Sequence, residues 1–307
     1  MTLEEGRPET ASRNRRAFLL AGGAAVIPGL AGCTGDGDEQ DSPAATESDT
    51  ATDTPSPTAI AADGLLAHYT LDGDTPTDAS GNGNDATIGG PMNVDVSGQV
   101  DGAYEYTDQS PTNDGGSHLA LPAFGLSGDD SHTLACWINA DELSASSGYE
   151  GTNFFWLGGG GDGSKLYLQY FGDGNNSRSN HVVRHSINEG DDDDFGPEGG
   201  NGIGLEGDDV VQGDNLPLNQ WFHLAATYDD STGEWKLYVD GSQLASKTDQ
   251  LGESDSLDLN FTGEENTIGG QRNDDLSRTF DGKIDEVRIY DRALSESEVQ
   301  ALASQSS

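Results

Sequence analysis

Oxygen-bearing side chains gather in one glycine-rich loop, residues 72–85. Its candidate ligand oxygens belong to Asp72, Asp78, Asn82 and Asp85, and its glycines allow the backbone to curl around an ion. Calcium takes six to eight such hard oxygens, from carboxylates, amides and main-chain carbonyls. Asp and Asn are equally common in ordinary turns, where they accept hydrogen bonds from their own backbone. The loop alone therefore leaves a calcium site and a plain turn both open.

Asp285 is the second acidic residue whose position predicts chemistry. Strict alternation along residues 285–289 puts Asp285 on the same face as Val287 and Ile289, toward the apolar layer. Burying an unpaired carboxylate is costly, so a cation or hydrogen-bond donors must accompany it. Calcium is the expected partner, and a purely hydrogen-bonded Asp285 is the alternative.

A second group of residues could contact a sugar. Trp156 precedes the glycine run 158–161 and is predicted to be an exposed ring on which the apolar side of a pyranose could stack. Tyr170, Arg178 and His181 lie at or near the start of a long acidic, glycine-rich stretch, residues 172–219. Such stretches are either binding loops or solvent-facing insertions. Residues 181–185 are more simply explained as another strand with charged residues on its wet face.

The elements that must position these residues are predicted to be β-strands. From residue 64 onward, short runs of alternating apolar residues are separated by Gly, Asn and Asp clusters, which is typical of a sandwich or barrel. The clearest runs are 65–71, 134–138, 166–170, 222–228 and 235–239. Their alternate residues turn inward together and form one core.

Two local signals end the strand pattern. Asp240 and Gly241 suit turn positions with positive φ and predict a hairpin. Ser295 with Glu298 three residues later fits a capping box, followed by apolar residues at helical spacing. A short C-terminal helix is the only helix expected in the folded domain.

The first 62 residues are predicted to be an export signal and a spacer. Residues 13–33 read RNRRAFLLAGGAAVIPGLAGC, a basic start followed by an apolar run, which indicates an export signal. Arg15 and Arg16 resemble a twin-arginine signal, and residues 30–33 resemble a lipobox whose Cys33 is lipidated after cleavage. The uncharged run is shorter than the roughly 20 residues of a spanning helix, which argues against an uncleaved anchor.

We therefore expect three regions: a signal over residues 1–33, a disordered Thr-, Ser-, Asp- and Pro-rich linker over 34–62, and one folded domain over 63–307. The linker has too few large apolar residues to offset the entropy of ordering its backbone. The expected location is the extracellular face of the cell membrane, with the lipid as the only membrane attachment.

The charge of the chain excludes one class of partner. Lys and Arg number 14 against 55 Asp and Glu, a formal net charge of -41. Such a surface repels phosphate backbones, so nucleic acid is not an expected partner. Molar salt would screen the self-repulsion, which favours a halophilic protein over an acidic mesophilic one.

Four blocks of the sequence resemble one known family. Residues 66–90, 133–140, 221–240 and 266–302, the last including FDGKIDEVRIYDRALSESEVQAL, are similar in order to the strands of laminin-G-like domains in the concanavalin A-like lectin/glucanase superfamily. The resemblance implies an all-β, two-sheet antiparallel jelly-roll sandwich. With the signal and the acidic composition, the whole chain looks like a lipoprotein of haloarchaeal type.

The resemblance also implies that loop 72–85 and the last strand lie side by side and share one structural Ca²⁺. Asp72, Asp78 and Asp285 match that pattern best, and Asn82 and Asp85 match it less well.

Binding, rather than catalysis, is the expected function. Related glucanases carry an E-x-D-x-x-E or E-x-D-x-E strand that supplies close carboxylates, and this sequence has neither. It also has no Gly-x-Ser-x-Gly elbow or phosphate loop, and Cys136 fits a small buried hydrophobe rather than a nucleophile. A lectin-like module for polysaccharide or surface glycoprotein is the first hypothesis. A glycoside hydrolase-like enzyme and a structural envelope protein are the alternatives.

Overall fold

The computed structural model describes ten segments of the chain: residues 59–107, 116–126, 130–143, 151–158, 165–171, 182–188, 201–204, 216–248, 266–270 and 280–306. The chain divides into two units, residues 1–54 and 55–307, and every described residue belongs to the second. The predicted signal residues Arg15, Arg16 and Cys33 therefore lie outside the described residues. No helix within the described segments is long and apolar enough to cross a membrane.

The larger sheet is built mainly from the N-terminal and C-terminal thirds of the domain. Its strands follow the order β13 (Ser242–Thr248), β12 (Glu234–Val239), β11 (Phe222–Asp229), β6 (His132–Glu142), β15 (Asp281–Tyr290), β4 (Gly102–Tyr106) and β3 (Met92–Ser97), and β1 (Leu65–Tyr69) also pairs with β15.

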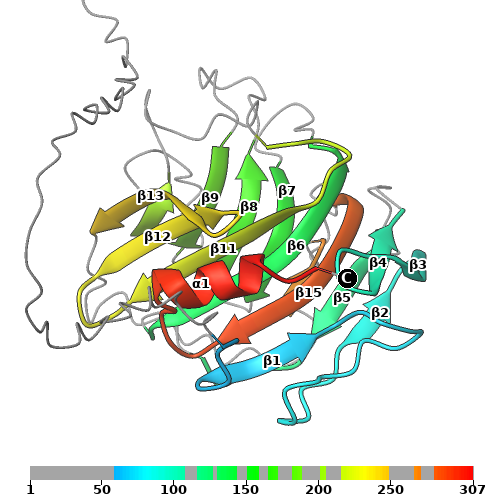
Figure 1. The fold of residues 1–307 in the computed structure, drawn as a ribbon, viewed down its shortest axis with the longest axis horizontal. Coiled ribbons are helices and arrows are strands. Elements are labelled where there is room, and N and C mark those ends of the chain that lie inside the picture. Colours follow the sequence, from blue (N-terminus) through cyan, green and yellow to red (C-terminus); the bar gives the residue numbers. More distant parts are fainter. Residues whose placement is uncertain are drawn as a thin grey trace, which may run out of the picture. The chain divides into compact units, whose positions relative to one another are not determined.

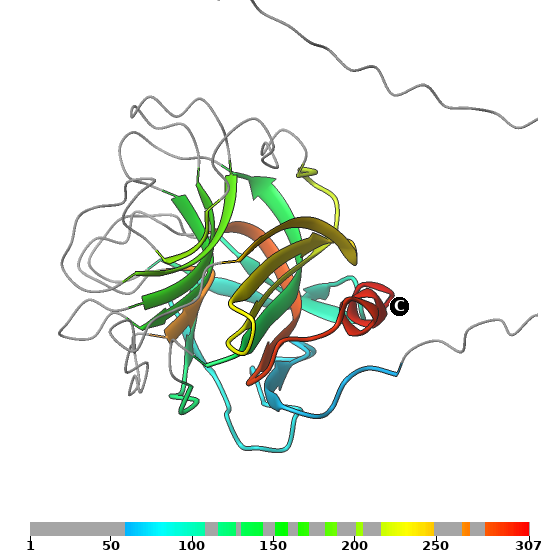
Figure 2. The same ribbon diagram turned by 90° about the vertical axis from the view of Figure 1, so that its left-hand side faces the viewer.

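The smaller sheet faces the larger one across the core (Figures 1 and 2). Its order is β10 (Asn201–Gly204), β9 (Val182–Asn188), β8 (Lys165–Phe171), β7 (Gly151–Gly158), β14 (Asn266–Ile268), β5 (His118–Leu121) and β2 (Thr87–Gly89). Neighbouring strands pair antiparallel in both sheets. The predicted two-sheet jelly-roll sandwich is confirmed.

Alternation along the strands fills the space between the sheets. Leu134, Cys136 and Ile138 of β6 all lie in this core, as do Leu166 and Leu168 of β8. Their neighbours in sequence point to the outer faces, as the two-residue period requires. Cys136 is buried and makes no disulfide, which confirms its prediction as a small core residue.

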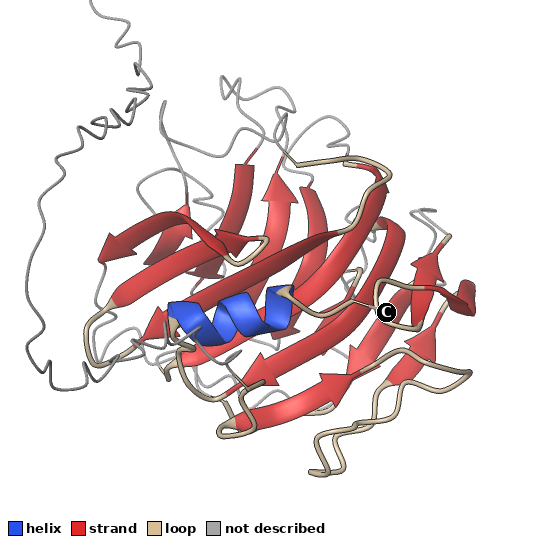
Figure 3. Cartoon of the chain, viewed as in Figure 1, coloured by secondary structure: helices blue, strands red, loops and turns tan. Residues whose placement is uncertain are grey.

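Helix α1 (Glu296–Ala303) packs on the outer face of the larger sheet (Figures 1 and 3). Its buried Val299 and Leu302 pack on four residues of the sheet: Ala135, Ala225, Tyr238 and Tyr290. The predicted capping box is confirmed, because Ser295 and Glu298 each bond the other's backbone. The predicted hairpin is also confirmed, with Asp240 at φ 49° and Gly241 at φ 72° between β12 and β13.

Candidate binding site

Several buried polar atoms of the domain have no hydrogen-bond partner, and packing alone does not explain them. Within the described segments, most of them lie on the two outer faces of the sandwich rather than between its sheets. Leaving a buried polar group unpaired costs about 1–3 kcal/mol, so native folds keep few of them. Clusters of such atoms therefore mark candidate sites for ligands, ions or water.

The outer face of β7 and β8 carries the first cluster. Trp156 lies opposite Tyr167 in the strand pairing, and Asn153 lies opposite Gln169. The rings of Trp156 and Tyr167 stack, with centroids 5.9 Å apart and planes at 19°. We call these four residues the amide–aromatic face.

A β-bulge in β7 determines which face of the sheet these residues lie on. The pairing of β7 with β8 shifts register between Asn153 and Phe155. Two consecutive residues, Phe154 and Phe155, then enter the inter-sheet core. Asn153 and Trp156 consequently flank them on the outer side, although strict alternation would place the two on opposite faces.

The two amides of this face have no partners. Both side-chain polar atoms of Asn153 and both of Gln169 are buried without a hydrogen bond, and the two residues are 0% exposed. An amide offers two N–H donors and a carbonyl acceptor. Sugar hydroxyls both donate and accept, so two amides beside stacked rings offer the groups that bind a sugar, although all four side chains are covered in this structure.

The predicted sugar-contacting residues do not assemble as expected. Trp156 is buried, 3% exposed, which corrects the expectation of an open platform. Tyr170 faces the inter-sheet core, on the opposite side of β8 from Tyr167, because its position has the parity of Leu166 and Leu168. Arg178 and His181 lie outside the described residues.

Sequence reasoning missed Asn153 and Gln169. Gln169 alternates with the core residues Leu168 and Tyr170, which signals an outward position in a strand. The bulge that aligns Asn153 with it carries no comparable signal in the sequence.

Asp285 lies at a β-bulge in β15, and its side chain is on the opposite face of the sheet from the predicted one. Ile284 and Val287 both lie in the core, so two residues fit between consecutive inward positions. Glu286, at φ 51°, absorbs the extra residue, and Asp285 pairs opposite Trp137 of β6. Asp285 therefore does not share the face of Val287, because the bulge breaks the alternation.

Asp285 is nevertheless fully buried. Its Oδ2 accepts the backbone N–H groups of Gln99 and Val100, each at 2.9 Å, whereas its Oδ1 has no partner. Burial raises the pKa of this carboxyl to about 7. Asp72 binds the same turn through Oδ1, which accepts the N–H of Gly102 at 2.7 Å. The structure thus brings two predicted calcium ligands, Asp72 and Asp285, to one turn between β3 and β4.

The other three predicted ligands organise loop 72–85 against β1. Asp78 accepts hydrogen bonds from the backbone N–H groups of residues 68, 80 and 84 and from the hydroxyl of Ser80. Asp85 accepts the N–H of Asp78, and Asn82 donates to the carbonyls of residues 65 and 66. Within the described residues, no three His, Cys, Asp or Glu side chains come close enough to hold a metal ion.

The residues therefore fit a calcium ion only in part. The partnerless oxygen of Asp285 is suited to a cation, and Asp72 lies on the same turn. Asp78 instead uses both carboxylate oxygens as hydrogen-bond acceptors, for N–H groups of its own loop and of β1.

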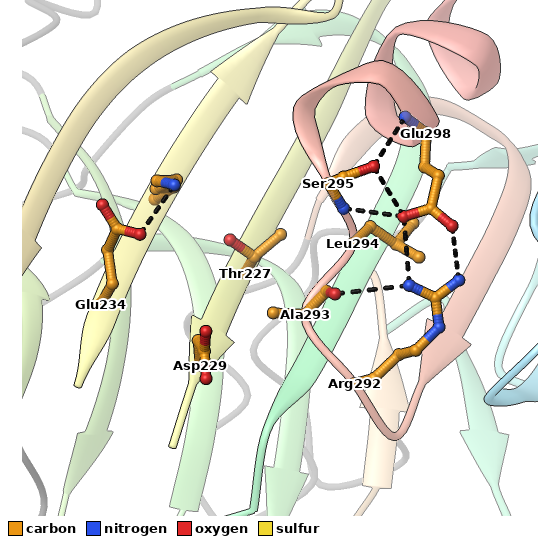
Figure 4. A pocket seen from close by; sticks show the side chains of 9 residues that line it. Thr227, Asp229, Glu234, Arg292, Ala293, Leu294, Ser295 and Glu298 are labelled. Atoms are coloured by element: carbon orange, nitrogen blue, oxygen red, sulfur yellow. Dashed lines mark hydrogen bonds and ion pairs between the residues drawn. The ribbon is translucent and has the colours of Figure 1, made fainter. Parts of the chain in front are cut away.

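An open cleft of about 310 Å³ lies beside the start of α1 (Figure 4). Four of its charged groups pair with one another, and the fifth, Asp229, accepts hydrogen bonds from Ser231. Lys236 binds Glu234 at 2.7 Å, and Arg292 binds Glu298 at 2.6 Å. The pair of Arg292 and Glu298 joins α1 to the segment that follows β15. Few polar groups of the cleft are therefore left for a ligand.

Comparison with known proteins identifies the family of the fold. A family model described as the concanavalin A-like lectin/glucanases superfamily matches residues 113–300. Among curated proteins, no significant match is found.

Two solved structures resemble the domain at low identity. Domain 4 of AbnA, a GH43 extracellular arabinanase from Geobacillus stearothermophilus in complex with arabinotriose, is 22% identical with a TM-score of 0.53, over 78% of this chain and 98% of that one. The binding domain of botulinum neurotoxin DC, in complex with rat synaptotagmin II, is 13% identical with a TM-score of 0.51. That match covers 79% of this chain and 52% of the chain of that binding domain, about half of its length.

Proposed function

The chain belongs to the concanavalin A-like lectin/glucanases superfamily, and from this premise we propose that its domain is a glycan-binding module. The amide–aromatic face is the proposed site. This superfamily contains lectins and glucanases, so the fold alone is compatible with binding and with hydrolysis. The choice between them depends on the site.

One observation carries the proposal: Asn153 and Gln169 keep four buried amide atoms without partners beside the stacked pair Trp156 and Tyr167. A structural role would favour apolar residues at these positions, because a buried unpaired amide lowers stability. A role in ligand binding explains why the amides are there. The arabinotriose complex of AbnA domain 4 supports a sugar as the ligand class, since that domain has the same fold.

The lining predicts an uncharged sugar. The amide–aromatic face has no ionisable group except the phenol of Tyr167, and the chain carries a net charge of -41. Acidic glycans would be repelled by that field over long distances at low salt. Binding of a neutral glycan should depend weakly on ionic strength, because no ion pair is formed.

The test uses the full-length chain carrying Cys33→Ser, in buffer with molar sodium chloride. Arabinotriose is the first probe, followed by a panel of neutral oligosaccharides and polysaccharides, with calorimetry as the measurement. Gln169→Met removes the amide but keeps the length of the side chain. We expect this variant to melt at the same or a higher temperature and to lose binding by about tenfold or more, the effect of one or two hydrogen bonds.

Gln243→Met is the matched control, because Gln243 is exposed on β13 in the other sheet. It should leave both melting temperature and binding unchanged. Retention of full affinity by Gln169→Met, or no binding of any glycan by a folded protein, would reject the site and favour a structural or protein-binding role.

We also propose a structural calcium ion near Asp72 and Asp285. Its support is the partnerless buried oxygen of Asp285 and the two carboxylates that hold one turn. Calcium there would supply charge that stabilises the turn and would take no part in glycan chemistry.

The location is a further proposal that rests on the N-terminal residues alone. Arg15 and Arg16 would direct export, and Cys33 would carry a lipid of two chains, because one acyl chain gives only marginal attachment. Cys33→Ser should release the protein into the medium. A variant that still fractionates with membranes would contradict the anchor.

A further inference from the structure

A second open cleft lies at one end of the sandwich, where β6 begins and β11 and β15 end. Its volume is about 410 Å³, near the lower end of the roughly 300–1,000 Å³ that is typical of ligand clefts. We call it the end cleft. Its large apolar side chains are those of Leu66, Phe124 and Leu126, and its acidic ones are those of Asp130, Asp230 and Asp291.

The apolar part of the end cleft is continuous with the core. Leu126 is a core residue and only 5% exposed, whereas Leu66 and Phe124 are partly buried and pack against the same core. The pairing of β1 with β15 shifts register between Leu65 and Ala67, so Leu66 is the extra residue of a β-bulge. The cleft thus presents one aromatic ring and two aliphatic side chains on a firmly packed base.

Three exposed aspartates complete the lining, and their backbones are held at strand ends. Asp230 follows β11 and donates its N–H to the hydroxyl of Ser131 at 2.9 Å. Asp291 follows β15 and donates its N–H to the carbonyl of Gly64 at 2.9 Å. Asp130 precedes β6 by one residue. The sheet, rather than a long loop, therefore places these carboxylates.

The end cleft carries negative charge without a cation of its own. Among the described residues that line it, none is Lys, Arg or His. Arg292, next to Asp291 in the sequence, is bound to Glu298 at 2.6 Å. A metal ion is not the matching cation, because no three acidic or histidine side chains of the described segments come close enough to hold one. The cleft instead suits a larger cation with an apolar part.

We propose that the end cleft binds the basic side chain of a partner polypeptide, with arginine preferred over lysine. Such a side chain joins an apolar stem to a charged head, which matches a lining that is apolar on one part and acidic on the other. The stem packs on Leu66 and Leu126, the guanidinium plane stacks on Phe124, and its N–H groups bond the aspartate oxygens.

Arginine is preferred because its planar fork bonds carboxylates in pairs and is weakly hydrated, whereas the ammonium of lysine is strongly hydrated. The apolar contact also keeps the site effective in salt. Molar salt shortens the Debye length to about 3 Å and screens exposed charges, but it does not weaken packing on the ring and the leucines. The end cleft shares no residue with the amide–aromatic face, so the two sites are independent.

Three short peptides test the proposal on the full-length chain carrying Cys33→Ser, with ligand-observed NMR as the measurement. Each peptide is blocked at both ends and places one residue between glycines: arginine, lysine or citrulline. Citrulline keeps the shape of arginine but has no charge. We expect the arginine peptide to bind about tenfold more tightly than the citrulline peptide, with lysine between them. No binding of the arginine peptide, or equal binding of the arginine and citrulline peptides, would overturn the proposal.

Phe124→Leu locates the binding without changing the charge. The leucine keeps the cleft apolar but removes the ring, so the affinity for the arginine peptide should fall about threefold or more. Full affinity in a folded Phe124→Leu variant would mean that the guanidinium does not stack there and would contradict the site.

A pair of double variants separates the end cleft from the general attraction of an acidic protein. Asp230→Asn with Asp291→Asn should weaken binding of the arginine peptide about tenfold or more, and both positions are exposed, so the fold should persist. Asp141→Asn with Glu142→Gln is the matched control, because it removes two exposed charges at the opposite end of β6. Equal losses in the two double variants would show that only the overall charge attracts the peptide and would reject the cleft.

Discussion

The Nε2 atoms of His132 and His185 lie 3.0 Å apart in the core and join the two sheets of the sandwich. Nδ1 of His132 lies 2.8 Å from the carbonyl oxygen of Asp130, so this nitrogen carries the proton. Nε2 of His132 must then accept the proton of His185. The bond requires a neutral His132 ring.

This pair predicts acid sensitivity. Burial lowers the pKa of His132 to about 4 and that of His185 well below its ordinary value. In the unfolded chain both titrate near 6.5, so the unfolded state binds more protons below that pH. The contribution of these histidines to stability is therefore nearly constant well above pH 6.5 and falls toward pH 4, by about 2 kcal/mol per histidine at pH 5.

Urea unfolding from pH 7.5 to 4.5 at constant salt measures this slope. The double variant His132→Phe, His185→Leu should remove this contribution. What remains is the similar contribution of His223, with its pKa lowered to about 3, and the opposite contribution of Asp285, with its pKa raised to about 7. A double variant as acid-sensitive as the wild type would contradict this assignment.

The link between Arg292 and Glu298 predicts how firmly α1 is held. Glu298 accepts from both terminal nitrogens of Arg292 and from the N–H of Ser295 (Figure 4), and the Arg292 hydrogen bond is the main reason that its pKa falls to about 2. Glu298→Ala removes the cap and the ion pair together and should cost about 1–2 kcal/mol in urea unfolding. Because its folded pKa is lowered, this contribution is present above pH 4.5 and disappears toward pH 2.

Glu296→Ala is the comparison, since Glu296 is exposed in the same first turn and bonds only Gln300. It should change stability by a few tenths of a kcal/mol. Equal losses in the two variants would mean that general helix propensity, rather than the Arg292 contact, sets the effect.

The two-residue period of the strands was sufficient to predict the fold, because it depends on many residues at once. It identified the inward faces of β6, β8, β11 and β12 and the turn at Asp240 and Gly241. The site depends on exceptions to the period. The bulges at Asn153 and at Glu286 each turn neighbouring residues to an unexpected face, and a bulge leaves no strong signal in one sequence. Trp156 has the predicted type for a sugar contact, but the structure buries it beside Tyr167 of the adjacent strand, which the strand period does not reveal.

Gly241 predicts a steric limit between the β12–β13 hairpin and α1. Its φ is 72°, and a Cβ there would lie 3.0 Å from Cα of Gln300 and 3.2 Å from Cβ of Ala303. Gly241→Ala should therefore lower the free energy of unfolding by about 1–2 kcal/mol for an alanine in the left-handed region. Displacing the helix adds a further loss.

Gly125→Ala is the comparison that measures the conformational cost by itself. Gly125 has a similar φ of 70°, and a Cβ added there would meet nothing within 4 Å. Its alanine variant should show the conformational cost alone, so thermal unfolding should place Gly241→Ala below it. If both variants melt at the same temperature, the helix does not press on this turn.

Asp285→Asn is the variant that tests the proposed calcium ion. The amide keeps one oxygen for the N–H groups of Gln99 and Val100 but removes the charge that would hold a cation. Wild-type protein should melt at a higher temperature in millimolar calcium than in a chelator, and the variant should show no such difference. Magnesium, which demands a tighter octahedral site, should replace calcium poorly.

Asp78→Asn tests whether Asp78, in loop 72–85, belongs to the same calcium site as Asp72 and Asp285. Asp78 accepts N–H groups of three residues that fold loop 72–85 onto β1. Its variant should lose stability equally in calcium and in chelator, because the loss is one of hydrogen bonding. Abolition of the calcium effect by Asp78→Asn, with Asp285→Asn unaffected, would move the ion from the turn at residues 98–102 into loop 72–85.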